Sequence, residues 1–118
     1  MTVYGIQVTQ LPRVPTSTPR RLYPTLRGMR IALSRLQGQD GVGKPYRVRM
    51  VDPEEAEVGM MLVDDEGAPV RRSGDHVTIY QDLHRARHAA SRLGGSIRGI
   101  RRDPLTKAEL EGCPGFGT

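Results

Sequence analysis

Two histidines, His84 and His88, are the first residues whose spacing could support chemistry. Four residues apart on a helix, they would share one face and could ligate a metal ion. Arginines surround the pair and would repel a cation, and His76 and Cys113 are the only other histidine or cysteine ligands in the chain. We therefore expect no metal site and interpret the two side chains as solvated histidines on a basic helix.

The segment GQDGVGK, residues 38–44, has the spacing of a phosphate-binding loop up to its lysine. Such a loop needs Ser or Thr after the lysine to hold magnesium, but Pro45 follows Lys44. It also needs a strand before it and a helix after it, whereas the pattern here predicts helix, loop and strand. The segment therefore predicts a surface loop, and we expect no nucleotide cofactor.

Two serines and two aspartates, Ser34, Ser91, Asp52 and Asp103, could be read as catalytic groups. Neither serine has a neighbouring base or a strained turn, which nucleophilic catalysis requires. Each aspartate precedes a proline, which is typical of a turn after a strand. The sequence therefore predicts a protein that is not an enzyme.

Basic residues recur at three matching positions of two predicted helices, outside the apolar stripes: Arg27, Arg30 and Arg35 in the first helix, and His84, Arg87 and Arg92 in the second. Core packing does not explain this recurrence. We predict that these six residues form a basic surface for a nucleic-acid backbone or an acidic protein. In the alternative interpretation, Arg30 and Arg87 bridge to Asp52 and Asp103, or were inherited from an ancestral copy without a role.

These positions belong to a stretch that occurs twice, at 23–38 and 80–95, with eight of sixteen residues identical. Thr25 and Asp82 are good N-caps, so each copy predicts a helix that starts there. Gly38 and Gly95 follow as helix ends. The expected apolar stripes are Leu26, Met29, Leu33 and Leu36 in the first helix, and Leu83, Ala86, Ala90 and Leu93 in the second.

A strand and an Asp-Pro turn follow each helix, so the copies extend over 23–53 and 80–104. Two strand-helix-strand copies predict an α+β, ferredoxin-like sandwich with both helices adjacent on one face of the sheet. A hairpin at 57–72 would extend one edge. The segment Val3 to Val8 is a strand that could serve the first copy. Alternatively, the copies form a less regular α/β dimer in which this strand pairs across chains.

Length and composition complete the expected organisation. A chain of 118 residues fits one domain, which we place at 20–104. Residues 1–19 would form a strand or arm and a proline-rich linker, and residues 105–118 a flexible tail. One cysteine and no signal-peptide pattern suggest a cytoplasmic protein, and no apolar stretch is long enough to cross a membrane.

The net charge of +5 is unevenly distributed. Residues 52–66 hold seven acids and no Lys or Arg, while the rest of the chain is basic. Sixteen of the eighteen basic residues are arginine, which suits phosphate but also follows from a GC-rich genome. The leading prediction is a non-enzymatic binding or accessory module. The alternative is a structural or assembly protein, for example in a phage particle, that self-associates through residues 52–66.

Overall fold

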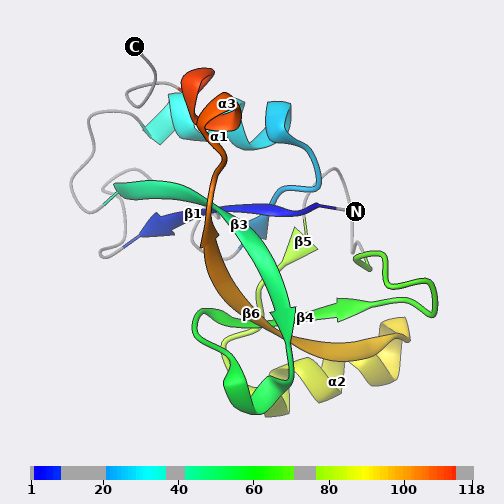
Figure 1. The fold of residues 1–118 in the computed structure, drawn as a ribbon. Helices are drawn as coiled ribbons and strands as arrows, with labels where there is room; N and C mark the ends of the chain where they lie inside the picture. The colour runs from blue at the N-terminus through cyan, green and yellow to red at the C-terminus, as the bar shows by residue number, and fades with distance from the viewer. Residues whose placement is uncertain (1, 9–20, 37–41, 71–76, 114–118) are drawn as a thin grey trace.

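The computed structural model describes residues 2–8, 21–36, 42–70 and 77–113 (Figure 1). In chain order its elements are β1 (Tyr4–Val8), β2 (Arg21–Leu22), α1 (Leu26–Leu36), β3 (Val42–Val51), the 3₁₀ helix η2 (Pro53–Glu55), β4 (Gly59–Val63), β5 (Val77–Thr78), α2 (Leu83–Leu93), β6 (Ser96–Pro104) and α3 (Lys107–Glu111). The fold is therefore mixed α+β, as expected. Among the described helices none is long and apolar enough to cross a membrane.

A curled, four-stranded antiparallel sheet forms the centre of the molecule, in the order β1-β3-β6-β4 (Figure 1). The two long strands that follow the helices, β3 and β6, are the central pair. In their register Arg49 lies opposite Arg101, and Met50 lies opposite Ile100. β1 pairs with β3 of the same chain, so the N-terminal strand has its place in the monomer.

Two short strands and two bridges close the curled sheet into a ring. β2 pairs with β5, with Arg21 opposite Thr78. The next residues link this pair to the sheet edges: Tyr23 bridges to Tyr4 in β1, and Tyr80 bridges to Met60 in β4. Each bridge has two backbone hydrogen bonds of 2.7 to 2.9 Å. Hydrogen bonding thus runs continuously through β1, β3, β6, β4, β5 and β2.

Two hydrophobic clusters form the core. The first is built from residues that the ring strands supply: Val3, Leu22, Tyr46, Met61, Val63, Val77, Ile79 and Ile100. The second lies beneath α1 and joins Tyr4, Ile6, Tyr23, Met29, Ala32, Leu33, Leu36 and Cys113. Burial of these apolar side chains is the main contribution to the free energy of folding. Within the part of the chain that the structure describes, the second cluster has no equivalent of the same size beneath α2.

The two long helices begin at the expected caps. The Gly28 amide donates to the Thr25 hydroxyl at 3.0 Å, and the Arg85 amide donates to Asp82 Oδ1 at 2.8 Å. α2 ends at Gly94, whose φ of 79° favours glycine; Gly38 lies outside the described residues.

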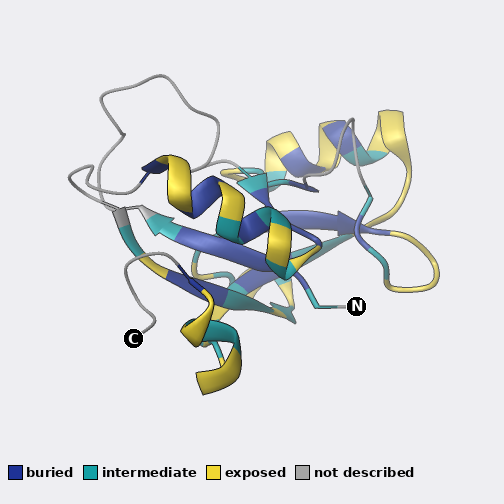
Figure 2. Cartoon of the chain, turned by 90° about the horizontal axis from the view of Figure 1, so that it is seen from above, coloured by how far each residue is buried: buried dark blue, intermediate teal, exposed yellow. Residues whose placement is uncertain are grey.

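The predicted stripes are buried to different degrees. In α1 the buried residues are Met29, Ala32, Leu33 and Leu36, and Leu26 is half-buried. In α2 only Ala86 and Ala89 are buried, Leu83 and Ala90 are half-buried, and Leu93 is 41% exposed. Figure 2 shows this difference as dark residues along α1 and mainly exposed residues along α2. The prediction that Leu93 faces the core was therefore wrong, because little of the structure covers the end of α2.

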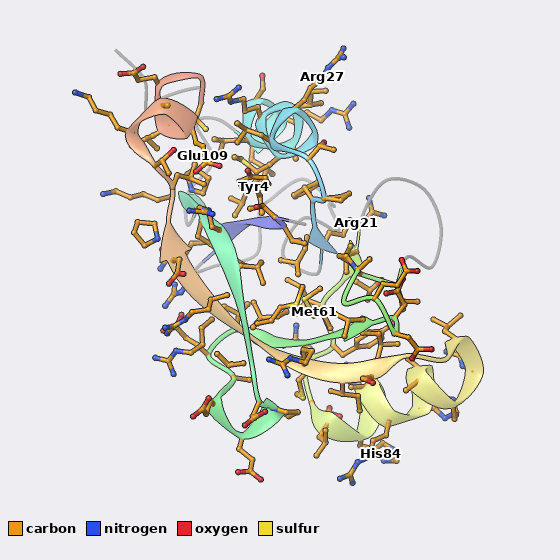
Figure 3. All side chains as sticks on the ribbon, turned by 45° about the vertical axis from the view of Figure 1, so that its right-hand side comes forward. Tyr4, Arg21, Arg27, Met61, His84 and Glu109 are labelled. Atoms are coloured by element: carbon orange, nitrogen blue, oxygen red, sulfur yellow. The ribbon has the colours of Figure 1, made fainter. Side chains whose placement is uncertain are left out.

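The ferredoxin-like arrangement is not confirmed. α1 packs against β1 and β3 and α2 against β4 and β6, so the helices lie at opposite ends of the molecule (Figure 1). Figure 3 shows the same separation, with Arg27 on α1 and His84 on α2 far apart. β2 and β5, which precede the helices, are only two residues long and cannot act as central strands. The expected adjacency of the two helices was wrong for this reason.

Two smaller segments complete the fold. A tight turn follows β4, in which the Asp64 carboxylate accepts from the Glu66 and Ala68 amides and Val63 bridges to Pro69. This accounts for residues 57–70 of the predicted hairpin. Residues 105–113 include α3, and Leu105 and Cys113 pack with the cluster beneath α1. Residues 114–118 lie outside the described part of the chain.

Candidate functional site

A basic surface lies on the side of α2 that faces away from the sheet. His84, Arg85, His88 and Arg92 are exposed and line one shallow hollow together with Tyr80 and Ala89. We call this surface the α2 face. A helix brings residues four and eight positions apart onto one side, which places His84, His88 and Arg92 together. Of the three residues predicted on this helix, His84 and Arg92 line the hollow and Arg87 does not. Figure 3 shows His84 directed outward from the end of the molecule.

The basic side chains of the α2 face are largely without internal partners. Arg85 Nε lies 3.4 Å from Asp82 Oδ2, within the first turn of the helix. Within the described residues His84, His88 and Arg92 make no ion pair and donate no side-chain hydrogen bond. These side chains are therefore available to an anionic partner.

The arginines of the central strands differ from Arg87 and Arg92 of α2, because each strand arginine has a partner. Arg47 Nε lies 3.8 Å from Glu109 Oε1, Arg49 Nε 3.7 Å from Asp103 Oδ1, and Arg98 donates to the Met50 carbonyl. Arg102 Nε donates to Glu57 Oε1 at 2.8 Å, and Arg101 lies 4.0 Å from Glu57 Oε2. The hydrogen bond from Arg102 lowers the pKa of Glu57 below its usual value. The strand arginines are thus paired with groups of the same chain.

On α1 the three predicted arginines differ in exposure and in hydrogen bonding. Arg27 and Arg35 are exposed and line a second hollow with Ile31, which is 46% exposed, and Ser34. Arg30 also reaches this hollow, but its Nη2 donates to the Glu109 carbonyl of α3 at 2.7 Å. Because α1 and α2 lie at opposite ends, the six predicted residues do not form one continuous surface.

Arg30 belongs to a polar cluster that holds α3 in place. The Glu109 carboxylate accepts from the Tyr4 hydroxyl at 2.6 Å and from the Thr106 amide at 2.9 Å. The hydrogen bond from Tyr4 is the largest of several interactions that lower the pKa of Glu109. Burial and this hydrogen bond together raise the pKa of Tyr4. The alternative interpretation, in which Arg30 bridges to an Asp-Pro aspartate, does not describe this contact, since Arg30 donates to the Glu109 carbonyl and Asp103 pairs with Arg49.

Arg87 lies on a different flank of α2, away from the α2 face. It lines a hollow with Leu83, Ile97, Asp52, Pro53 and Glu54, which we call the α2 notch. Although Arg87 and Asp52 share this hollow, they form no ion pair among the described residues. The notch therefore combines a free arginine, exposed acids and half-buried apolar side chains.

Sequence reasoning missed a polar hollow to which β1, β3, β6 and the segments before β4 and α2 all contribute. It is lined by Ile6, Gln7, Tyr46, Glu57, Val58, Gln81 and Arg102. Burial raises the pKa of Tyr46 to about 12, so its hydroxyl stays protonated at neutral pH and cannot serve as a base. The residues come from distant parts of the chain, and no local pattern could have grouped them.

The chemical motifs of the sequence are distributed as follows. His84 and His88 are exposed on α2, and the described residues contain no group of three potential metal ligands. His76 and residues 38–41 lie outside the described residues, while Lys44 is exposed in β3 after a helix and not before one. The Ser91 hydroxyl donates to the His88 carbonyl within its own helix, and Ser34 is exposed on α1.

No protein-family model matches this chain, and no curated protein or solved structure is significantly similar to it.

Proposed function

We propose that the protein is a non-enzymatic, cytoplasmic binding module that holds the phosphate backbone of nucleic acid on the α2 face. The observation that carries this proposal is the contrast between two groups of basic side chains. The strand arginines have partners within the chain, whereas His84, His88 and Arg92 have none among the described residues. Basic side chains left unpaired on one helical face are suited to an external polyanion.

The chemistry of the α2 face favours phosphate over bases. Guanidinium groups form charge-assisted hydrogen bonds with phosphate oxygens. Base stacking would need several aromatic side chains, but Tyr80 is the one aromatic residue that lines this hollow. Binding should therefore tolerate changes of nucleotide sequence. Arg27 and Arg35 would offer a second, weaker contact at the opposite end.

The test is a double charge reversal, Arg85→Glu with Arg92→Glu. We expect duplexes of unrelated sequence to lose affinity about equally, and the slope of log affinity against log salt to become shallower by roughly two units. Glutamate at 85 lies three residues after the N-cap Asp82, a position where helices accept it well. Fluorescence anisotropy at several salt concentrations measures both quantities.

The matched control reverses two exposed cations at the other end of the molecule, Lys44→Glu with Lys107→Glu. Net charge changes by the same amount in both variants. If the control weakens binding as strongly as the α2 variant, attraction is a property of total charge and the proposal is wrong. Absence of binding by the parent protein at low salt would also reject it.

Self-association through the acidic segment is the second candidate. Asp52, Glu54, Glu55, Asp65 and Glu66 are exposed, which leaves them available to a basic surface of another copy. Glu57 is less suited to this role because Arg101 and Arg102 already neutralise it. Sedimentation velocity would show an oligomer that dissociates as salt rises, in the absence of nucleic acid.

A further inference from the structure

The α1 end and the α2 end of the molecule share a helix of the same length, an arginine at the same helix position and a strand that ends near Asp-Pro. Arg30 and Arg87 are each the fifth residue of an eleven-residue helix. β3 and β6 each end near Asp-Pro, and in their antiparallel pairing the end of one strand lies beside the start of the other. The segment after β6 therefore lies near α1, and the segment after β3 lies near α2.

At the α1 end, the segment after the strand fills the space beside the helix. Leu105, two residues after Asp103, packs with Leu26 on the cluster beneath α1. The C-terminal end of α3 meets Arg30, whose Nη2 donates to the Glu109 carbonyl at 2.7 Å. A Cβ atom added at Gly112 would overlap the Arg30 guanidinium, so this contact is closely packed.

At the α2 end, the corresponding space is open. Glu54, two residues after Asp52, is exposed where Leu105 is packed at the other end. Leu83 and Ile97 are half-buried, and Arg87 has no partner among the residues that the structure describes. η2 is a single turn of three residues and does not cover them.

We propose that the α2 notch binds a short amphipathic helix from a partner protein, held as α1 holds α3. An apolar side chain of the partner would pack on Leu83 and Ile97. The C-terminal carbonyls of the partner helix would accept from Arg87, as the Glu109 carbonyl accepts from Arg30.

Charge complementarity favours a helix over nucleic acid in the notch. Asp52 and Glu54 lie on the same hollow as Arg87 and would repel phosphate. A helix carries partial positive charge at its N-terminus and partial negative charge at its C-terminus. With its N-terminus near the two acids and its C-terminus at Arg87, a helix complements both charges. The chain's own α3 is already held by Tyr4, Arg30 and its capping box, so a separate partner is the natural occupant.

A labelled peptide with the sequence of residues 104–112, PLTKAELEG, is a suitable probe because it carries the chemistry of α3. We expect the intact protein to bind it with a dissociation constant of roughly 10⁻⁴ M, since a short peptide must become ordered on binding. Arg87→Ala should weaken binding at least about tenfold, the effect of losing a charged hydrogen bond. The control Arg92→Ala, on the α2 face, should leave binding unchanged. A peptide with Leu105→Ser should bind poorly.

The proposal fails if the peptide does not bind near 1 mM, a concentration about ten times the expected constant, or if Arg92→Ala weakens binding as much as Arg87→Ala. It also fails if amide chemical shifts move in residues 105–113 and not in residues 83–97, because the peptide would then replace α3 on α1. If a duplex displaces the peptide and Arg87→Ala weakens both, the notch belongs to a nucleic-acid surface.

This inference is independent of the proposed function. The Arg85→Glu, Arg92→Glu variant should lose duplex binding and still bind the peptide, whereas Arg87→Ala should show the opposite behaviour. Each proposal can therefore fail while the other stands.

Discussion

The α1 end and the α2 end of this molecule share a sequence pattern but differ in how far the rest of the chain covers the helix. Leu36 and Leu93 are each the last residue of their helix, yet Leu36 is 3% exposed and Leu93 is 41% exposed. Arg30 is held by α3, while Arg87 lies on an open notch. The difference arises outside the helices, in the segment that follows each central strand.

That difference shows why a repeated residue need not have a repeated role. At the α1 end, Leu105 and α3 convert an exposed arginine into part of a packed cluster. At the α2 end, η2 is too short to do so, and the same residue type stays available to solvent or to a partner. The identity of a residue is therefore less informative than the length of the segment that covers it.

The leucines at the two helix ends offer the largest test of this comparison. Leu36→Ala should lower the free energy of unfolding by about 2 to 5 kcal/mol, because it leaves a cavity beneath α1. Leu93→Ala removes the same atoms from an exposed position and should cost less than about 0.5 kcal/mol. Urea unfolding of both variants measures the two values. Equal losses would mean that α2 is covered as fully as α1.

Arg30 and Arg87 provide the next test. Arg30→Ala removes the charged donor to the Glu109 carbonyl and leaves the Cys113 thiol, which donates to the same carbonyl at 3.4 Å. It should loosen α3, at a local cost of about 1.5 to 3 kcal/mol. Cys113 is buried under this contact, so its thiol should react about ten to a hundred times faster with a disulfide reagent. Arg87→Ala should leave the reaction rate unchanged. If the Cys113 thiol reacts faster in both variants, the contact from Arg30 does not specifically stabilise the docking of α3.

Local sequence signals predicted the helices well and the topology less well. Thr25 and Asp82 are the observed caps. The α+β class is confirmed, because each predicted helix is present and is followed by a strand. The ferredoxin-like order was inferred from strands before each helix. β2 and β5 proved too short for that role, and their pairing depends on contacts between residues far apart in the chain.

The candidate surface was partly accessible to sequence reasoning. Helical spacing grouped His84 and Arg92 correctly, since residues on one helix keep their relative positions. The role of Arg30 was not predictable, because its partner in α3 lies 79 residues away. The different surroundings of Arg30 and Arg87 depend on where the chain runs after β6, which the sequence pattern does not show.

The two N-caps should show a smaller and nearly equal effect. Thr25→Ala and Asp82→Ala each remove one side-chain acceptor at a helix start and should each cost about 1 kcal/mol in unfolding free energy. Thr25→Ser and Asp82→Asn keep an acceptor and should restore most of the loss. Chemical denaturation checks all four variants. If Asp82→Ala leaves the free energy of unfolding unchanged, the N-cap of α2 does not contribute to stability.

The smallest expected effect is the acid sensitivity of α3. The pKa of Glu109 is lowered in the folded protein, chiefly by the hydrogen bond from Tyr4. A lowered folded-state pKa gives stability that is present above the ordinary glutamate pKa and is lost as pH falls through the folded value.

The Cys113 thiol should therefore become more reactive towards 4,4′-dithiodipyridine as pH falls below about 4.5, compared with a peptide around Cys113 at each pH. In Glu109→Gln this acid dependence should disappear, because no carboxylate is left to protonate. Glu57→Gln is the matched control: Glu57 also has a lowered pKa, but its partners are Arg101 and Arg102 and not residues of α3. Loss of the acid dependence in the Glu57 variant as well would show that the whole fold, and not the docking of α3, responds to pH.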